Sequence, residues 1–388
     1  MNQGRSVFAQ IMDFLPERRL RTIVERYRGD YKVRSLSSLE HFYVMAFAQL
    51  TYREGLRDIE ACLTALGPKL YHMGIRNPVR RSTLAYANET RDWRIFAETG
   101  QMLTEMARLL YMDDPLAVDI QSVVYAFDST TVDLCLSLFP WAKFRRTKAA
   151  VKAHTLLDIR GSIPSFLYIS DGSIHDVNAL DTLLFEPGAI YLLDRAYLDF
   201  TRLHKIRMAG SFFITRAKRN LKISILVDHP ARGAGVIADQ TIQLTTWKSH
   251  SCYREPLRLI TCKDEKTQRM CRFLTNHFLV PAETIAALYR ERWKVELFFK
   301  WIKQHLRIKV FYGTSENAVK MQIWSAVCVY LLVAIAKKEL RINLDLYRIL
   351  QVLSVHVFEK VPIQELLVAK TPEIIGSNEL IQLELFKL

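Results

Sequence analysis

The sequence has few cysteines, and none of its six forms a C-x-x-C pair. This scatter gives little support for a structural zinc site or a disulfide framework, and it fits a reducing cytoplasm. The sequence also lacks low-complexity tracts, so disorder is not expected to dominate the chain. The first residues contain no apolar core followed by small residues, and we therefore expect no secretory signal.

A long apolar run is also missing. The one segment that could be mistaken for a membrane span, residues 321–335, covers about 15 residues, whereas a spanning helix needs roughly 20. We therefore predict a buried or interface helix there, and no membrane partner.

Positive charge, by contrast, is abundant. Lys and Arg number 54 against 40 Asp and Glu, which gives the 388-residue chain a formal net charge of +14. Such an excess indicates a polyanionic partner, with nucleic acid favoured over an anionic membrane. The length suggests roughly two or three folding units, each large enough to bury a core.

The hydrophobic spacing divides the chain into three regions. Residues 1–115 have apolar residues at three- and four-residue spacing, which predicts a helical N-terminal domain. Residues 116–312 alternate strand-like and helical segments, which predicts an α/β fold with a mixed sheet. Within them, residues 220–278 are predicted to form a β-rich insertion. Residues 313–388 are predicted to be a helical C-terminal region that packs on the core or pairs with another subunit.

Basic residues gather in the middle of the chain and near the end of the N-terminal region. Two arginines stand just before a short predicted helix that opens at Ser82. This segment could be a helix-turn-helix reading element or an ordinary solvated helical face. The candidate DNA contacts from all these clusters are Arg80, Arg81, Arg145, Arg146, Lys148, Arg216 and Lys218.

Two acids follow apolar strand-like runs directly. Asp128 comes after VVYAF, and Asp194 comes after AIYLL. A buried acid is costly unless it is hydrogen-bonded, paired or bound to a metal, and one such acid could equally be a turn or helix cap. Two acids at matching strand ends, together with a third acid on a helix, favour a metal-binding site for Mg²⁺ or Mn²⁺. A pair of these ions about 4 Å apart needs at least three carboxylates.

Asp171 competes with Asp194, because it also closes an apolar run. If the two strands that follow Asp128 form a meander, Asp171 lies two strands away from Asp128. The strand before Asp194 is reached by a helical crossover, so it can pair beside the Asp128 strand and run parallel to it. We therefore favour Asp194.

The third acid, Glu296, lies in a long helix predicted to start at Pro281. At about 100° per residue, Tyr289, Arg292, Glu296 and Lys303 share a stripe about 60° wide. The stripe could be a solvated face with an Arg292–Glu296 pair. Apolar side chains cover most of the remaining circumference, however, which favours a stripe that lines a site.

Three motifs, in this order along the chain, resemble those of bacterial insertion-sequence transposases of the DDE class. Asp128-Ser-Thr resembles the family's first-aspartate motif, and Asp194-Arg-Ala-Tyr197 resembles its second-aspartate motif, D-x-G/A-Y/F. The spacing Tyr289-x2-Arg292-x3-Glu296-x6-Lys303 resembles its Y-R-E-K signature. Together they span about residues 120–310. The segment FAQLTYREGLRDIE also resembles the helical domain that precedes the core in one branch of these enzymes.

This resemblance implies an RNase H-like catalytic core with a β insertion before the glutamate helix. It implies a DNA transposase that cleaves at terminal inverted repeats and joins the released 3′-OH to target DNA. The partners implied are double-stranded DNA and a second copy of the chain, in the bacterial cytoplasm with the nucleoid. Two rivals remain open: a two-metal nuclease of the same fold that does not join strands, and a transposase-derived DNA-binding protein without chemistry.

The resemblance also implies roles for individual residues. The catalytic residues, and the ligands of two Mg²⁺ or Mn²⁺ ions, would be Asp128, Asp194 and Glu296. The DNA contacts would be Tyr289, Arg292 and Lys303, with Trp247 as a wedge from the β insertion. The roles of His175 and Asp176 are left open between substrate contact and structural support.

Overall fold

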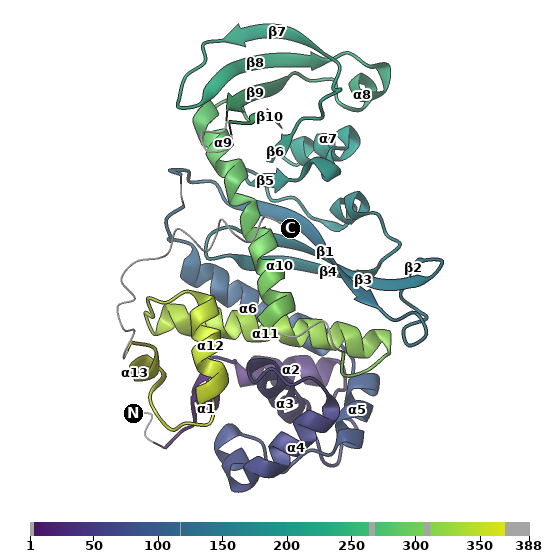
Figure 1. The fold of residues 1–388 in the computed structure, drawn as a ribbon, viewed down its shortest axis with the longest axis vertical. Helices are drawn as coiled ribbons and strands as arrows, with labels where there is room; N and C mark the ends of the chain where they lie inside the picture. The colour runs from purple at the N-terminus through teal and green to yellow at the C-terminus, as the bar shows by residue number, and fades with distance from the viewer. Residues whose placement is uncertain (1–3, 117, 264–267, 306–310, 369–388) are drawn as a thin grey trace.

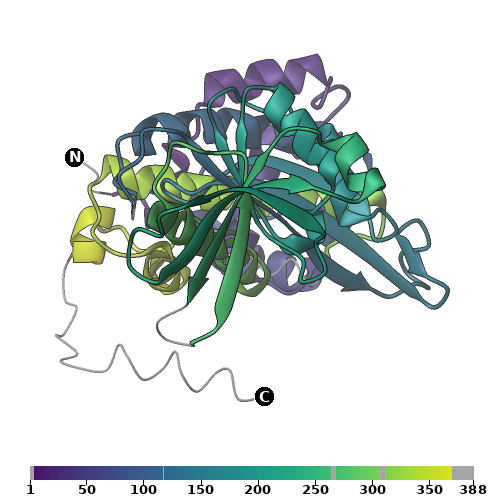
Figure 2. The ribbon, with the colours of Figure 1, turned by 90° about the horizontal axis from the view of Figure 1, so that it is seen from above.

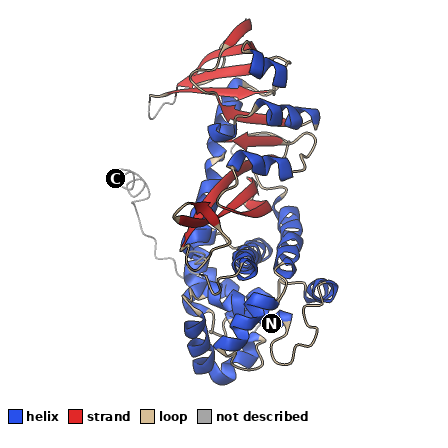
Figure 3. Ribbon diagram, turned by 90° about the vertical axis from the view of Figure 1, so that its right-hand side faces the viewer, coloured by secondary structure: helices blue, strands red, loops and turns tan. Residues whose placement is uncertain are grey.

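The computed structural model describes residues 4–116, 118–263, 268–305 and 311–368. Helices fill one end of the molecule, and a sheet with flanking helices fills the other (Figures 1 and 3). The helical end is built from α1 (Val7–Met12), α2 (Glu17–Arg26), α3 (Ser38–Leu50), α4 (Leu56–Leu66), η1 (Gly67–Met73), α5 (Arg81–Thr90) and α6 (Arg94–Tyr111). The C-terminal helices α11 (Glu316–Glu339), α12 (Leu346–His356) and α13 (Ile363–Val368) pack among them.

Helix α11 is the central helix of this end. It is long and apolar enough to cross a membrane, but 94% of its most apolar window is buried inside the protein. The prediction of a buried helix over residues 321–335 is therefore confirmed. Helix α6 approaches it closely at Gly100, where a Cβ atom would lie 2.7 Å from the Trp324 ring.

The strands in the described residues form one mixed sheet in the order β2-β3-β1-β5-β6-β10-β9-β8-β7, with β4 paired to β3. Successive strands are rotated relative to one another, so the sheet is strongly twisted (Figure 2). The strands are β1 (Val124–Leu134), β2 (Lys143–Arg145), β3 (Lys148–Asp158), β4 (Ile163–Asp171), β5 (Ile190–Leu193), β6 (Phe212–Arg216), β7 (Ile223–His229), β8 (Val236–Leu244), β9 (Leu257–Lys263) and β10 (Met270–Thr275).

Strands β1, β5 and β6 are parallel neighbours, and the other pairings are antiparallel. Helix α7 (Phe200–Met208) makes the crossover from β5 to β6. The mixed sheet with helical flanks predicted from the sequence is thus confirmed. Residues 220–278 continue the same sheet, because β10 pairs with β6. They also include a short helix, α8 (Trp247–Cys252).

The single long helix predicted from Pro281 is wrong in one respect. The structure has two helices, α9 (Ala282–Glu291) and α10 (Trp293–His305), which meet at Arg292. Two tight i→i−3 hydrogen bonds replace the α-helical pattern there, from Arg292 N to Tyr289 O and from Val295 N to Arg292 O. Arg292 keeps a right-handed helical conformation, so α9 and α10 continue nearly in line across the sheet (Figure 1).

A buried arginine ties the outer strands to the start of α9. The Arg258 guanidinium on β9 donates two hydrogen bonds to the Asp239 carboxylate on β8, at 2.8 and 2.7 Å. Its remaining nitrogen donates to the carbonyl oxygens of His277, Phe278 and Val280, at 3.2, 3.3 and 2.6 Å. Because these carbonyls lie between β10 and α9, Arg258 fixes the segment that leads into the Glu296 helix.

Candidate active site

The sheet register places two of the predicted acids at neighbouring strand ends. Phe127 of β1 pairs with Leu193 of β5 in parallel register, and each is followed directly by an acid, Asp128 and Asp194. Asp194 precedes the short helix η3 (Arg195–Tyr197), and its carboxylate accepts a hydrogen bond from Arg195 N at 2.6 Å. The predicted strand order is therefore confirmed.

Asp171 lies elsewhere. It pairs with Val151 of β3, which in turn pairs with Val132 of β1. Asp171 is therefore two strands away from β1, and its register matches Val132 and not Asp128. Its carboxylate accepts hydrogen bonds from the Ser173 backbone N–H, at 2.8 Å, and from the Ser173 hydroxyl. Asp171 thus closes a turn.

Arg292 connects Asp128 to the third acid. One guanidinium nitrogen donates to Asp128 Oδ2 at 3.1 Å, and the other donates to Glu296 Oε1 at 2.5 Å. The Arg292 side chain is only 11% exposed. The alternative of a simply solvated Arg292–Glu296 pair is therefore wrong, and the break between α9 and α10 lies directly at the site.

The acids influence one another electrostatically. Burial, helped by the charges of Glu296 and Asp194, raises the pKa of Asp128 to about 6. The Ser129 N–H, which donates to Asp128 Oδ1 at 2.8 Å, and the Arg292 guanidinium act in the opposite direction. Asp128 is therefore a carboxylate whose negative charge is incompletely compensated by its protein neighbours.

The donor set fits a hard divalent cation. Its predicted members are all carboxylates, which Mg²⁺ and Mn²⁺ prefer, and the cationic Arg292 already lies between two of them. In the part of the chain that the structure describes, no three Asp, Glu, His or Cys side chains are gathered closely enough to enclose a metal. The chemistry of the residues fits the ion, although the structure does not assemble a coordination sphere.

Comparison with known proteins identifies the family. A model described as the Transposase DDE domain matches residues 120–332. A protein of Sinorhizobium fredii (strain NBRC 101917 / NGR234) that is named as a transposase is 34% identical over 282 residues, which cover 71% of this chain and 77% of that protein. The chain belongs to the DDE transposase family. It is a DNA transposase, an enzyme that cleaves and joins DNA strands, and membership of this family implies the use of a divalent metal.

A second relative agrees with this assignment. A Geobacillus stearothermophilus protein named as the transposase of insertion sequence element IS5377 is 34% identical over 208 residues, 53% of this chain and 54% of that protein. A domain of unknown function (DUF4372) matches residues 3–76. A solved structure of the piggyBac transposase synaptic complex with hairpin DNA matches at a TM-score of 0.46 and 10% identity, over 95% of this chain and 81% of that one.

In the transposase, the other residues of the predicted signature lie along the same helical crossing. Lys303 Nζ donates to the Thr131 carbonyl oxygen of β1 at 2.6 Å. The Tyr289 ring packs on Phe273, with 5.0 Å between the ring centroids, and the Arg292 guanidinium lies 5.8 Å from the Tyr289 centroid. Tyr289, Arg292, Glu296 and Lys303 therefore all lie where α9 and α10 cross the sheet.

The remaining candidate DNA contacts of the transposase are spread out. Arg145, Arg146 and Lys148 are exposed at the β2–β3 hairpin, and Lys218 is exposed after β6. Arg216 lines a pocket of about 460 Å³ that also contains Tyr289. Arg80 and Arg81 lie at the start of α5 in the helical end, and Trp247 is 85% exposed on α8. Trp247 is not brought to the acids, because α8 lies at the far end of the sheet (Figure 1).

Sequence reasoning missed an ion pair between the buried Lys152 and the partly exposed Asp176. Lys152, on β3 beside β1, donates to the Ile174 carbonyl oxygen at 2.7 Å and lies 3.1 Å from Asp176 Oδ1. Asp176 is the first residue of η2 (Asp176–Thr182). His175 is the N-cap residue of this helix, but its side chain makes no capping hydrogen bond. Lys152 stands in a basic cluster, and its burial became visible only through the pairing of β3 with both β1 and β4.

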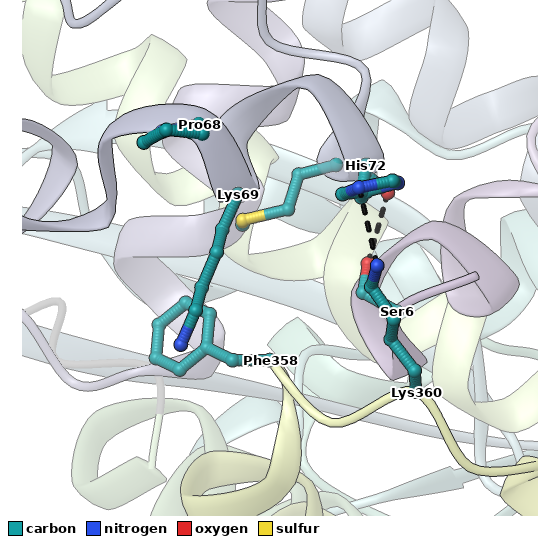
Figure 4. Close-up of a pocket in the computed structure, with 7 residues that line it drawn as sticks. Ser6, Pro68, Lys69, His72, Phe358 and Lys360 are labelled. Atoms are coloured by element: carbon teal, nitrogen blue, oxygen red, sulfur yellow. Dashed lines mark hydrogen bonds between the residues drawn. The ribbon is translucent and has the colours of Figure 1, made fainter. Parts of the chain in front are cut away.

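A separate pocket of about 280 Å³ lies where the N-terminal and C-terminal segments of the transposase meet (Figure 4). Lys360 Nζ lies 3.1 Å from His72 Nε2, and the Ser6 hydroxyl donates to the His72 carbonyl oxygen at 3.0 Å. The pocket contains none of the three acids, so it is not the candidate active site.

Proposed function

We propose that Asp128, Asp194 and Glu296 are the catalytic residues with which this transposase cleaves transposon ends and joins the 3′-OH to target DNA. The observation that carries the proposal is the parallel β1–β5 register, which places two acids side by side, together with the Arg292 bridge to the third. The sheet and the helix that crosses it are also what we expect of an RNase H-like core. The four residues at the crossing form the proposed Y-R-E-K signature.

We further propose that the three carboxylates hold two Mg²⁺ or Mn²⁺ ions. When bound, these ions would lower the pKa of an attacking hydroxyl and stabilise the leaving 3′ oxygen. Burial in the sheet fixes the direction of Asp128, and Arg292 orients Asp128 and Glu296 relative to each other. The chain thus holds the carboxylate oxygens in place for the ions and partly excludes water from them.

Arg292 has a second role in the proposal. Its two terminal nitrogens bind carboxylates, while its buried Nε has no hydrogen-bond partner among the described residues. A buried N–H without a partner is costly, and a phosphate oxygen of the substrate would satisfy it. Tyr289 would pack against an unpaired base beside the cleavage point, and Lys303 would hold a neighbouring phosphate.

The wider assembly belongs to the same proposal. Residues 1–115 would contribute to DNA binding, and residues 313–388 would take part in a homodimer that holds both ends of the element. The exposed arginines and lysines at the β2–β3 hairpin and after β6 would contact DNA phosphates. The enzyme would act in the bacterial cytoplasm, where its DNA lies.

The experiment that tests the function uses the purified chain, Mg²⁺, a duplex that carries one end of its element with flanking DNA, and a target plasmid. We expect cleavage at the element end, followed by a joined product, and we expect EDTA to abolish both. Cleavage without any joined product would contradict transposition and indicate a nuclease. Binding without cleavage at any Mg²⁺ concentration would contradict the catalytic assignment as well.

A further inference from the structure

A groove in the helical end is separate from the acids. It lies between residues 27–36, which connect α2 to α3, and one face of α5, and it has a volume of about 620 Å³. Its two walls come from segments far apart in the sequence. Its lining includes four basic residues and two tyrosines: Arg28, Lys32, Arg34, Arg91, Tyr31 and Tyr86.

The groove is strongly basic. Arg28, Lys32 and Arg34 are all exposed on one wall. The acids nearby are already engaged. Asp92 is paired with Arg94 at 2.5 Å. Asp30 accepts hydrogen bonds from the Ser38 N–H and hydroxyl at 2.6 and 2.8 Å, and it lies 4.0 Å from the Arg91 guanidinium. The three cations therefore face solvent with little local compensation.

Exposed tyrosines stand on both walls. Tyr31 on the connecting segment is 61% exposed, and Tyr86 on α5 is 72% exposed. The Arg28 guanidinium and the Lys32 ammonium lie 4.7 and 5.2 Å from the Tyr31 ring centroid. Cations interleaved with exposed aromatic rings are typical of nucleic-acid surfaces, where phosphates pair with the cations and sugars or bases pack on the rings.

The backbone of the basic wall is held in a strained conformation. Arg28 and Lys32 have φ angles of 54° and 56°, a left-handed conformation that non-glycine residues rarely adopt. The buried Arg91 donates to the carbonyl oxygens of Gly29, Leu36 and Ser37 at 3.3, 2.7 and 3.4 Å, and so clamps both ends of the segment. Strained conformations of this kind persist where the surrounding structure imposes them, and they cluster at binding sites.

We propose that this groove binds the phosphodiester backbone of double-stranded DNA, at a distance from the acids that cut it. Naming DNA as the occupant rests on the proposed function. Cations and tyrosine rings on the walls suit a phosphate backbone better than a lipid bilayer, which requires a continuous apolar face. The groove would hold the DNA in register while Asp128 acts elsewhere on the same molecule.

The test compares two triple variants of the full chain. The groove variant carries Arg28→Gln, Lys32→Gln and Arg34→Gln. The control carries Arg18→Gln, Arg21→Gln and Arg57→Gln, three exposed arginines of the same helical end that lose the same net charge outside the groove. The probe is a fluorescein-labelled duplex that carries one element end. Affinity is measured by fluorescence anisotropy over a range of NaCl concentrations, and melting temperatures verify folding.

We expect the groove variant to lose at least about tenfold in affinity, and its slope of log Kd against log salt to fall by about 2 to 3, as the loss of three phosphate contacts requires. A Tyr31→Ala/Tyr86→Ala variant should lose affinity with an unchanged slope. Equal losses in the groove and control triples would overturn the proposal. So would a groove triple that loses affinity for single-stranded RNA but not for duplex DNA.

Failure of this inference is distinguishable from failure of the proposed function. At saturating protein the groove variant should still cleave the duplex end, because its acids are intact. If the wild-type chain binds the duplex through the groove but never cleaves it, the proposed function fails while the binding site stands.

Discussion

Replacing Asp128 by asparagine is expected to reduce the rate of strand cleavage by at least about a thousandfold, with DNA affinity within about threefold of the wild type. Asparagine keeps the size of the side chain but removes the negative charge that Arg292 contacts and that a divalent cation requires. Glu296→Gln should have the same effect for the same reason. The measurement is single-turnover cleavage of an element-end duplex with Mg²⁺, beside a mobility shift with the same duplex.

The matched control is Asp133→Asn. Asp133 lies on the same strand as Asp128, but its side chain is exposed, so its loss should change the cleavage rate by less than about threefold. If Asp128→Asn kept more than about a tenth of the wild-type rate, the proposed role of the carboxylate would be wrong.

The second large effect concerns stability. Arg258→Met is expected to lower the free energy of unfolding by about 3 to 5 kcal/mol, the usual cost of breaking a buried ion pair by removing one partner. The variant leaves the Asp239 carboxylate buried without its cation, and it leaves the carbonyl oxygens before α9 without their donor. The measurement is a urea unfolding curve detected by circular dichroism, from which the midpoint and slope are obtained.

Two further variants test whether the loss of stability comes from the buried Asp239 charge. Arg254→Met, at an exposed arginine that precedes β9, should change the unfolding free energy by less than about 0.5 kcal/mol. The double variant Asp239→Leu/Arg258→Met should recover much of the loss, because no uncompensated buried charge remains. An Arg258→Met protein as stable as Arg254→Met would show that the clamp is not needed to hold the outer strands to α9.

The strand ends could be predicted from the sequence because the signals are local. An apolar run that stops at an acid marks a strand end, and a helical crossover ahead of the second run favours its parallel pairing beside the first. The structure confirms this pairing in the register of Phe127 with Leu193, which decides between Asp194 and Asp171. The buried helix α11 was predictable for a similar reason, since its apolar residues surround the whole helix.

The features that escaped prediction depend on distant partners. The break at Arg292 occurs where its side chain binds Asp128, a residue of another element. The pairing of Lys152 with Asp176 needs β3 to lie between β1 and β4. The shape of the basic wall in the groove depends on Arg91, which follows α5 and reaches back to residues 29–37. A continuous helical wheel or a charge count cannot describe such contacts.

The assignment of Asp194 to the active site is tested by comparing the cleavage rates of Asp194→Asn and Asp171→Asn on one element-end duplex with Mg²⁺. Both acids close apolar strands, but only Asp194 lies beside Asp128 in the sheet. We expect Asp194→Asn to lose cleavage by at least about a thousandfold, while Asp171→Asn stays within about threefold of the wild type. Cleavage that survives Asp194→Asn but is abolished by Asp171→Asn would show that the active site is not at the ends of β1 and β5.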